Sequence, residues 1–505
     1  MLMKLNYKRT ILVGFAFFLI SAFWQAYDAI VPLILNNHFG TSDLVSGIVM
    51  SLDNVLAVFM LPMFGALSDK VMTKFGRRTP FIFIGTVSAV LCFVALTFVD
   101  AVQLKALAEA GVTSAFDEAK AALAAVKEQF GDAAKAGDAT AIAAIDQASI
   151  AFANAKKELV ARASEITMGN IWPLIGFIAV LLLTLVSMAT FRSPAVALMP
   201  DVTVKPLRSK GNAIINLMGT AGGILVLVLG MIFATSDKLY MQYTGYVLAV
   251  CAIMVTGLLI FILTVKEKRW ADEMERDTRT LCLDEPAAED EGEKRTLSKG
   301  EFKSLMLILA SVALWYIGYN SITSKYSVYA TNVLGFDFNF TLIVAQAAAV
   351  VAYIPVGIVA SKIGRRRTIL AGVAMLATAF LIGAFIEPTT PSAVMYPVFI
   401  LAGIGWATIN VNSFPMVVEL AKGGDVGKYT GYYYTASMAA QIVAPIAAGG
   451  LYGVFNSFTD GNGMRYVFFP FGVLFVALSF VTMFLVKHGD AAAEKKGALE
   501  SFDVD

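Results

Sequence analysis

The sequence is poor in charged residues. Only 15% of its 505 residues are Asp, Glu, Lys or Arg, whereas soluble globular proteins carry about 25%. Hydrophobic residues make up 58%, which excludes an ordinary water-soluble globule and predicts a polytopic membrane protein. The formal net charge is +1, and the cations are spread among short segments instead of gathering in one patch, so no nucleic-acid partner is expected.

Histidine and cysteine are scarce as well. The two histidines are His38, in a predicted outer turn, and His488, at the predicted cytoplasmic end, so neither a buried histidine triad nor a histidine-rich metal centre is expected. The three cysteines have no paired spacing and predict neither a disulfide framework nor a metal site. A phosphate-binding loop ending in Gly-Lys-Ser or Gly-Lys-Thr is also absent, which excludes direct use of ATP. We therefore expect no metal, no cofactor and no enzymatic activity.

Long apolar runs dominate what is present. Each run is long enough to cross a hydrocarbon core, which needs about 20 helical residues. The twelve predicted spans cover residues 11–35, 43–66, 79–99, 169–198, 211–235, 241–265, 304–332, 339–361, 368–386, 392–418, 429–453 and 465–487. The connections after even-numbered spans carry most of the cations, and the short ones after odd-numbered spans carry almost none, with Lys238 and Arg465 as exceptions. The positive-inside rule therefore predicts a multi-pass protein of the cell membrane with both termini in the cytoplasm.

One basic connection is repeated. Gly65-Ala-Leu-Ser-Asp-Lys-Val-Met-Thr-Lys-Phe-Gly-Arg-Arg-Thr-Pro-Phe-Ile-Phe83 joins the second and third predicted spans. A second copy, Gly357-Ile-Val-Ala-Ser-Lys-Ile-Gly-Arg-Arg-Arg-Thr368, follows in the other part of the chain, with Ser361 where Asp69 would be. The repeat indicates two related halves. We expect an all-α membrane protein with twelve transmembrane helices in two pseudo-symmetric six-helix bundles.

The repeated loop resembles the signature loop of the major facilitator superfamily, and its Arg-Arg-Thr-Pro-Phe continuation resembles the sucrose-proton symporters of plants and their animal and bacterial relatives. In the superfamily, an acid that closes the fourth span pairs with the arginine of the loop after the second. The resemblance thus implies that Asp201 pairs with Arg77 or Arg78, and that Glu419 pairs with Arg365 or Arg366 in the other half. The alternative is that these are plain topology-setting charges. The predicted cytoplasmic gate comprises Asp69, Arg77, Arg78, Asp201, Arg208, Arg365, Arg366 and Glu419.

The fourth span departs from the plant carriers. The plant carriers have a Gly-Pro-Cys-Arg-Ala-Leu-Leu-Ala-Asp-Leu segment, with another acid earlier in the same helix. Aligning Pro194 and Asp201 with its Pro and final Asp puts Val196 at the plant arginine and Leu185 at the earlier, proton-coupling aspartate. Arg192, four residues before Val196, is the residue expected to replace the missing cation. Asp28 or Asp53 would then supply the titrating carboxylate.

Polar residues inside the spans are the candidates for chemistry, because a charge in hydrocarbon costs about 2.5–3.5 kcal/mol or more and usually persists for a function. Gln25 and Asp28 are three residues apart and share a helical face, with Trp24 beside them. Asp28 is the first candidate for coupling or substrate binding, the alternative being a structural acid bonded to a neighbouring helix. Asp53 and Asn54 could extend the same surface or serve packing.

The second half repeats this pattern weakly. Trp315-Tyr-Ile-Gly-Tyr-Asn320 resembles Trp24-Gln-Ala-Tyr-Asp28 with one residue inserted, so Asn320 and Asp28 would face each other across a central cavity. Trp406 and Asn410 share a face and suit a stacked, hydrogen-bonded sugar ring, although aromatic residues also pack helices. Lys325 is expected to extend to the surface. The remaining candidates of the substrate and coupling site are Tyr27, Tyr319, Asn412, Tyr433 and Gln441.

The expected domains are an N-terminal bundle (1–265), a cytoplasmic linker (266–303), a C-terminal bundle (304–487) and a cytoplasmic tail (488–505). An Ala-rich insertion at 100–168 interrupts the first bundle outside the membrane, and a break near 131–138 predicts two helices joined by a turn. The insertion is expected to be solvated, the alternative being an external cap that binds substrate or a partner.

The family resemblance implies a secondary active transporter that imports a disaccharide or another glycoside with a proton by alternating access. Its expected partners are the glycoside, the proton and the lipid bilayer, and a monomer is expected. Two alternatives remain open: an exporter or facilitator of a non-sugar small molecule, and a sugar-binding membrane receptor that transports nothing.

Overall fold

The computed structural model describes residues 5–135, 138–204, 207–236, 240–280, 298–388, 390–420, 426–459 and 461–487. These residues form helices and no strands. Eleven of the helices are long and apolar enough to cross a membrane, and a further one, α12 (Phe338–Ile363), is apolar over Phe338–Tyr353. The prediction of an all-α membrane protein is therefore confirmed, with a layout of twelve long apolar helices.

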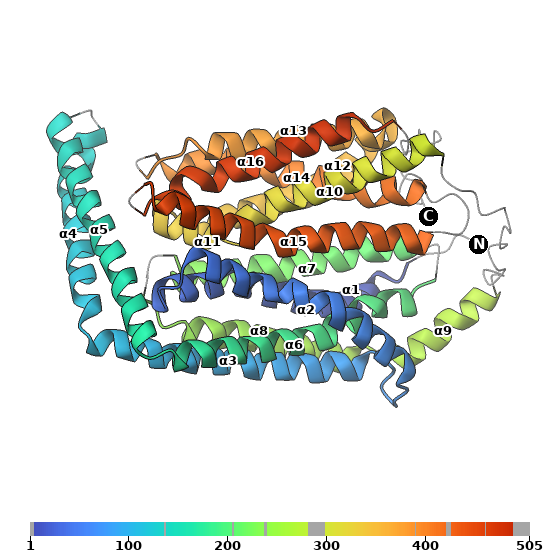
Figure 1. Ribbon diagram of the computed structural model, residues 1–505. Helices are drawn as coiled ribbons and strands as arrows, with labels where there is room; N and C mark the ends of the chain where they lie inside the picture. The colour runs from blue at the N-terminus through green and yellow to red at the C-terminus, as the bar shows by residue number, and fades with distance from the viewer. Residues whose placement is uncertain are drawn as a thin grey trace.

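The helices fall into two groups along the chain. The N-terminal half contains α1 (Tyr7–Leu33), α2 (Asp43–Lys70), α3 (Thr79–Glu109), α6 (Trp172–Asp201), α7 (Arg208–Ile232) and α8 (Thr244–Thr264). The C-terminal half contains α10 (Lys299–Thr323), α12, α13 (Arg365–Gly383), α14 (Met395–Glu419), α15 (Val426–Asn456) and α16 (Gly463–Phe484). Within the halves, α1 packs on α7, α3 on α6, α13 on α14 and α10 on α16; between them, α2 packs on α15 and α7 on α12 (Figure 1).

The first helix of each half ends in the same unusual way. α1 continues directly into the π-helical segment η1 (Ile34–His38), and α10 is followed by the short α11 (Tyr326–Val328) and the π-helical η3 (Tyr329–Leu334). π-Helical turns are rare and occur mostly at functional sites. The two halves therefore share a local feature beyond the sequence repeat, and both copies lie at one end of the bundle.

Among the described residues, three longer helices lie outside the two bundles. α4 (Val112–Lys135) and α5 (Ala139–Gly169) form a hairpin that stands across one end of the bundle, and α9 (Glu267–Thr280) lies at the opposite end (Figure 1). We call these the hairpin end and the α9 end. α3 runs on to Glu109, beyond the predicted span limit at residue 99, and Asp100 and Gln103 in its last turns are buried. Most of the predicted linker, residues 281–297, and the tail, 488–505, lie outside the described residues.

Candidate functional site

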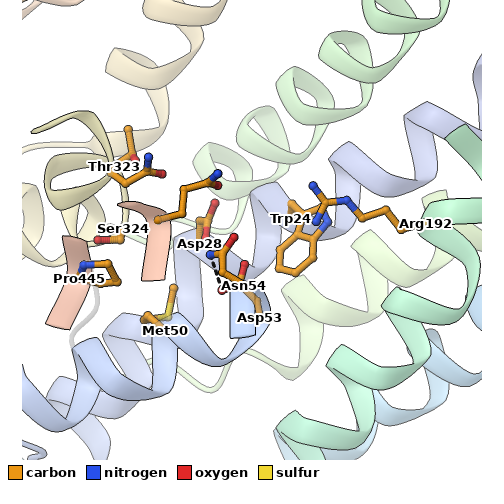
Figure 2. Close-up of a pocket in the computed structure, with 11 residues that line it drawn as sticks. Trp24, Asp28, Met50, Asp53, Asn54, Arg192, Thr323, Ser324 and Pro445 are labelled. Atoms are coloured by element: carbon orange, nitrogen blue, oxygen red, sulfur yellow. Dashed lines mark hydrogen bonds between the residues drawn. The ribbon is translucent and has the colours of Figure 1, made fainter. Parts of the chain in front are cut away.

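A cavity of about 190 Å³ lies between the two halves (Figure 2). Helices α1, α2 and α6 line it from the N-terminal half, and α10, its C-cap and α15 line it from the C-terminal half. The lining residues are Trp24, Asp28, Met50, Asp53, Asn54, Arg192, Asn320, Thr323, Ser324, Gln441 and Pro445. Seven of these eleven are residues that the sequence singled out, and they come from spans that are far apart in the chain.

Asp28 is the acid most open to this cavity. Its side chain is exposed although the residues on either side of it, Tyr27 and Ala29, are 1% exposed. Among the described residues, no side chain hydrogen-bonds or ion-pairs with the Asp28 carboxylate; only its backbone carbonyl accepts a bond, from Ser327 at 3.2 Å. An ionised carboxylate without a partner inside a protein is unfavourable unless water, a proton or a ligand compensates it. Asp28 can therefore take up a proton or accept a hydrogen bond from a substrate.

The second acid of the cavity, Asp53, has a hydrogen-bond donor and a cation as neighbours. Asp53 accepts a hydrogen bond from the side-chain amide of the adjacent Asn54 at 2.8 Å. It also lies close enough to Arg192 for the two charges to attract each other, and close enough to Asp28 for the two carboxylates to repel. The two acids thus have different surroundings, and Asp53 is the one whose negative charge is compensated.

Arg192 enters the cavity beside an aromatic ring. Its guanidinium carbon lies 5.5 Å from the centre of the Trp24 ring, and Figure 2 shows the two side chains side by side. Trp24 in turn packs edge-on against Tyr27 and Phe23. No ion pair of Arg192 is found among the described residues, so its charge is stabilised by the ring and by Asp53 through space. This arrangement leaves guanidinium N–H groups able to bind oxygen atoms of a ligand.

The C-terminal half contributes amides and hydroxyls. Asn320 donates its side-chain N–H to the carbonyl of Tyr316 at 2.8 Å, and Gln441 donates to that of Ser437 at 3.3 Å. Both amides are thereby fixed by their own helices while they line the cavity. Asn320 and Asp28 line the same cavity from α10 and α1, as the internal echo of the sequence predicts.

Other predicted residues lie outside the cavity lining. Trp406 stacks on Tyr319 with ring centres 3.6 Å apart and planes at 3°, and Trp315 is 0% exposed. Asn412 donates to the Thr408 carbonyl at 2.9 Å, and the Tyr433 hydroxyl bonds to Ser413 at 2.9 Å. Tyr27 is buried, Asn410 is half-buried on α14, and Gln25 accepts a 2.6 Å hydrogen bond from Gln346 of the other half. In this conformation these side chains pack helices or join the halves.

The hairpin end is closed by polar contacts between the halves. The Lys325 ammonium lies 2.9 Å from the Asp43 carboxylate and 2.8 Å from the Asp43 carbonyl oxygen, and only 1% of the lysine side chain is exposed. The prediction that Lys325 extends to the surface was wrong, because Asp43 starts α2 at the place where α10 ends. Further hydrogen bonds join Asn332 to Asn37 at 2.8 Å, Ser236 to Asp337 at 2.8 Å and Asn339 to Thr235 at 3.0 Å.

At the α9 end, the predicted arginine–acid pairs are present within the N-terminal half. Arg77 lies 2.9 Å and Arg78 2.8 Å from the Asp201 carboxylate, and Arg78 also binds Asp69 and Ser68. Arg78 is buried. The cluster joins α2, α3 and α6, so in this conformation it braces one half of the molecule.

The sequence did not suggest Glu267 of α9, which completes this cluster. Its two carboxylate oxygens accept hydrogen bonds from the backbone N–H groups of Arg77, Arg78 and Thr79 at 2.7–2.8 Å, and from the Thr79 hydroxyl at 2.7 Å. Free N–H groups at the start of a helix attract an acid. Gly76 precedes them with φ +120°, and a Cβ there would overlap Glu267. The segment after α8 is thereby attached to the repeated loop.

The corresponding cluster of the other half is described only in part. Arg366 donates to the carbonyls of Met483 and Phe484 at the end of α16, and its guanidinium lies over the Phe484 ring. The side chains of Arg208 and Glu419 lie outside the described residues, so the predicted pairing of Glu419 with Arg365 or Arg366 stays a prediction.

His38, which the sequence places in an outer turn, is buried in the structure. His38 is 0% exposed, and its Nδ1 lies 2.6 Å from the Asp100 carboxylate. Gln103 donates to the His38 carbonyl and to Thr167 of α5, both at 3.0 Å. This cluster could not be anticipated from sequence patterns, because its members come from η1, α3 and α5.

Comparisons with known proteins bear on the whole arrangement. The family model described as Major Facilitator Superfamily matches residues 159–421 and 339–503. The fold is similar to that of a D-xylose-proton symporter (TM-score 0.60, 14% identity, 96% of this chain and 99% of that one). It is also similar to the inward-open xylose transporter XylE from E. coli (TM-score 0.55, 14% identity, 94% and 95%) and to the nucleoside transporter NupG (TM-score 0.51, 15% identity, 94% and 99%). No curated protein sequence matches the chain.

Proposed function

The chain belongs to the Major Facilitator Superfamily, and from that premise we propose that it imports a sugar or glycoside together with a proton by alternating access. Membership makes the protein a multi-pass membrane transporter and not an enzyme. The finer proposal rests above all on one observation: the Asp28 carboxylate opens into a cavity shared by both halves and has no side-chain partner among the described residues.

The chemistry of the cavity supports a polyhydroxylated substrate. Carboxylates and side-chain amides bind hydroxyl groups, and the Trp24 ring offers an apolar surface next to the Arg192 guanidinium. Two of the similar solved structures are of transporters of xylose, which is a sugar, and one is of a transporter of nucleosides, which contain a sugar ring. At 14–15% identity these likenesses extend to the fold alone, so the substrate is argued from the cavity.

The volume of the cavity limits the size of the substrate that it can enclose. About 190 Å³ is below the range of roughly 300–1,000 Å³ that is usual for ligand pockets. We therefore favour a single sugar ring in this cavity, with any second ring of a disaccharide outside it. The hairpin end would face the exterior, as the distribution of loop cations predicts, and its closed contacts then correspond to a state after external loading.

In the proposed cycle, the substrate enters when the hairpin end is open and its hydroxyls bind the amides and acids of the cavity. Asp28 takes up the coupling proton, which removes the cost of enclosing its negative charge. The halves then close through Lys325 and Asp43. When the transporter returns to the state that is open at the hairpin end, the cluster of Arg77, Arg78 and Asp201 would stabilise the α9 end of the N-terminal half.

The test is the external pH of lightly buffered, de-energised cells that contain the protein, while a panel of monosaccharides, disaccharides and nucleosides is added one compound at a time. We expect an alkaline shift with particular sugars and none in Asp28→Asn at equal membrane expression. Asp146→Asn, an exposed acid of α5, is the matched control and should keep the shift. Gradient-driven accumulation by Asp28→Asn would rule out Asp28 as the coupling group.

Binding to the purified protein separates the alternatives. If a nucleoside or an apolar cation binds and no sugar does, the proposed substrate class is wrong. A sugar that binds but is neither accumulated nor exchanged by proteoliposomes would identify a receptor.

A further inference from the structure

The α4–α5 hairpin is firmly joined to the N-terminal half. Gln103 of α3 bonds to Thr167 of α5, next to the buried pair of His38 and Asp100. Gly40, with φ +58°, lies directly against α5, since a Cβ there would overlap the backbone of Ser164. A small cluster around the buried Phe116 and Leu159 packs the hairpin on Tyr240, in the connection before α8. The base of the hairpin should therefore move as one body with this half.

The same hairpin also reaches the other half. The Lys156 ammonium of α5 donates a 3.1 Å hydrogen bond to the backbone carbonyl of Thr331 in η3, and only 8% of this lysine is exposed. Figure 1 shows the hairpin standing across the end of both bundles. Gly461, before α16, has the Lys157 side chain as its neighbour. The hairpin thus bridges the two halves at the end that must open during alternating access.

Among the residues that the structure describes, Lys156 has one carbonyl partner and no acid. None of the ion pairs among the described residues involves it, although a buried ammonium is normally paired with a carboxylate. Burial alone lowers the pKa of Lys156 to about 7. The lysine is therefore a charge that the closed arrangement tolerates poorly, in contrast to Lys325, which has Asp43.

The titratable groups of the surrounding elements do not offset this burial. Next to Lys156 on α5 are Lys157 and Glu158, and η3 contributes Tyr329 alone. The packed elements α4, η1 and α3 add the described groups Asp117, Glu118, Lys120, Lys127, Glu128, His38, Asp100, Lys105 and Glu109, and α16, which packs on η3, adds Arg465.

We propose that the α4–α5 hairpin is a latch that moves with the N-terminal half, holds the hairpin end closed by placing Lys156 against Thr331 of the C-terminal half, and is released by acid. Separation of the halves returns Lys156 to water, where lysine titrates near about 10.4. Between about pH 7 and pH 10, opening binds a proton, so each unit of acidification favours the open form by up to about tenfold. Below about pH 7 the lysine is charged in both forms, and the effect levels off.

The proton that Lys156 binds on opening leaves to the same side on closing. The latch therefore adds no proton to the transport stoichiometry, and it is independent of the substrate. It makes the fraction of open transporters depend on the pH at the hairpin end.

The test measures opening without substrate. Protein in lipid nanodiscs, with its natural cysteines replaced, carries spin labels at Arg162→Cys of α5 and Ser457→Cys after α15, both exposed positions at the hairpin end. Pulsed EPR gives the fraction of long distances between about pH 6 and about pH 9. We expect that fraction to rise on acidification and to reach a plateau below about pH 7.

Two variants of Lys156 and one control variant test whether Lys156 causes the pH dependence of opening. Lys156→Met should abolish the pH dependence, and Lys156→Arg, which stays charged, should keep the open fraction of the acidic plateau up to about pH 9. Lys127→Met, an exposed lysine of α4, should behave as the unmodified protein. An unmodified protein whose distances do not change with pH, or a Lys156→Met variant that keeps the full response, would overturn the proposal. The control variant also reports whether loss of any hairpin lysine has the same effect.

Discussion

The ammonium of Lys325 and the carboxylate of Asp43 form an ion pair at 2.9 Å that joins the two halves, although the residues are 282 positions apart. Asn36 donates a second hydrogen bond to the same carboxylate oxygen, at 3.0 Å. Removing both charges from water is expensive, and only good geometry with further hydrogen bonds compensates it. The pair therefore makes closure of the hairpin end specific to one alignment of α2 with α10.

Breaking this pair on one side should open the hairpin end. Lys325→Met leaves the Asp43 carboxylate uncompensated in the closed form, which loses roughly 3–5 kcal/mol relative to the paired state. The measurement is thiol labelling of Thr323→Cys, a cavity position, by an impermeant reagent added from the hairpin side. We expect much faster labelling than in the protein with Lys325.

The double variant tests whether the charge is the cause. Lys325→Met with Asp43→Asn removes the stranded charge and should label more slowly than Lys325→Met alone. Equal rates in the single variant and the protein with an intact pair would show that the pair does not hold this end closed.

Close backbone packing should make a glycine of α15 essential for closure. A Cβ at Gly449 would overlap the carbonyl oxygen of Asp43, which belongs to the other half, whereas nothing lies within 4 Å of a Cβ at Gly453, one turn further along. Gly449→Ala should therefore keep the hairpin end open and abolish uptake, and Gly453→Ala should retain both. Substrate uptake and the same labelling assay measure the two effects. Normal closure in Gly449→Ala would mean that α2 and α15 can shift apart without consequence.

Glu267 should stabilise the start of α3. Glu267→Ala leaves the N–H groups of Arg77, Arg78 and Thr79 without their acceptor, and each unsatisfied group costs about 1–3 kcal/mol unless water reaches it. We expect a lower thermal unfolding temperature and faster hydrogen exchange around residue 77. Glu275→Ala removes an exposed i,i+4 pair with Arg279 and should change little. A variant without Glu267 that exchanges at the original rate would contradict this role.

The Tyr319–Trp406 stack should matter more for stability than for substrate binding. The two rings contact each other at 3.6 Å, and neither lines the cavity in this conformation, whereas Trp24 does. Trp406→Leu should lower the unfolding temperature, since an aromatic pair contributes about 0.5–1.5 kcal/mol beyond its buried area, and leave KM for the transported sugar nearly unchanged. Trp24→Leu should raise KM. A large rise in KM in Trp406→Leu would show that Trp406 contributes to substrate binding.

The sequence by itself determined the membrane class, the number of spans and the repeated basic loop. These properties are local: a span needs only enough consecutive apolar residues, and the Gly65–Phe83 loop needs only the order of its own residues. For the same reason Asp28, Asp53 and Arg192 were identifiable, because an ionisable residue within a long apolar run is conspicuous wherever it lies. The acid closing the fourth span, Asp201, was matched to Arg77 and Arg78 through the family resemblance.

Only the tertiary structure decided which polar residues meet. Trp406 and Tyr319 have the composition of a sugar-binding surface but stack on each other, and Lys325 has the sequence context of a surface lysine but is buried against Asp43. His38, Glu267 and Lys156 gave no signal in the sequence, since each acquires its role from a partner on a distant helix. The physical reason is that burial and pairing depend on which helices pack together, and helix periodicity does not determine which faces of the two halves meet.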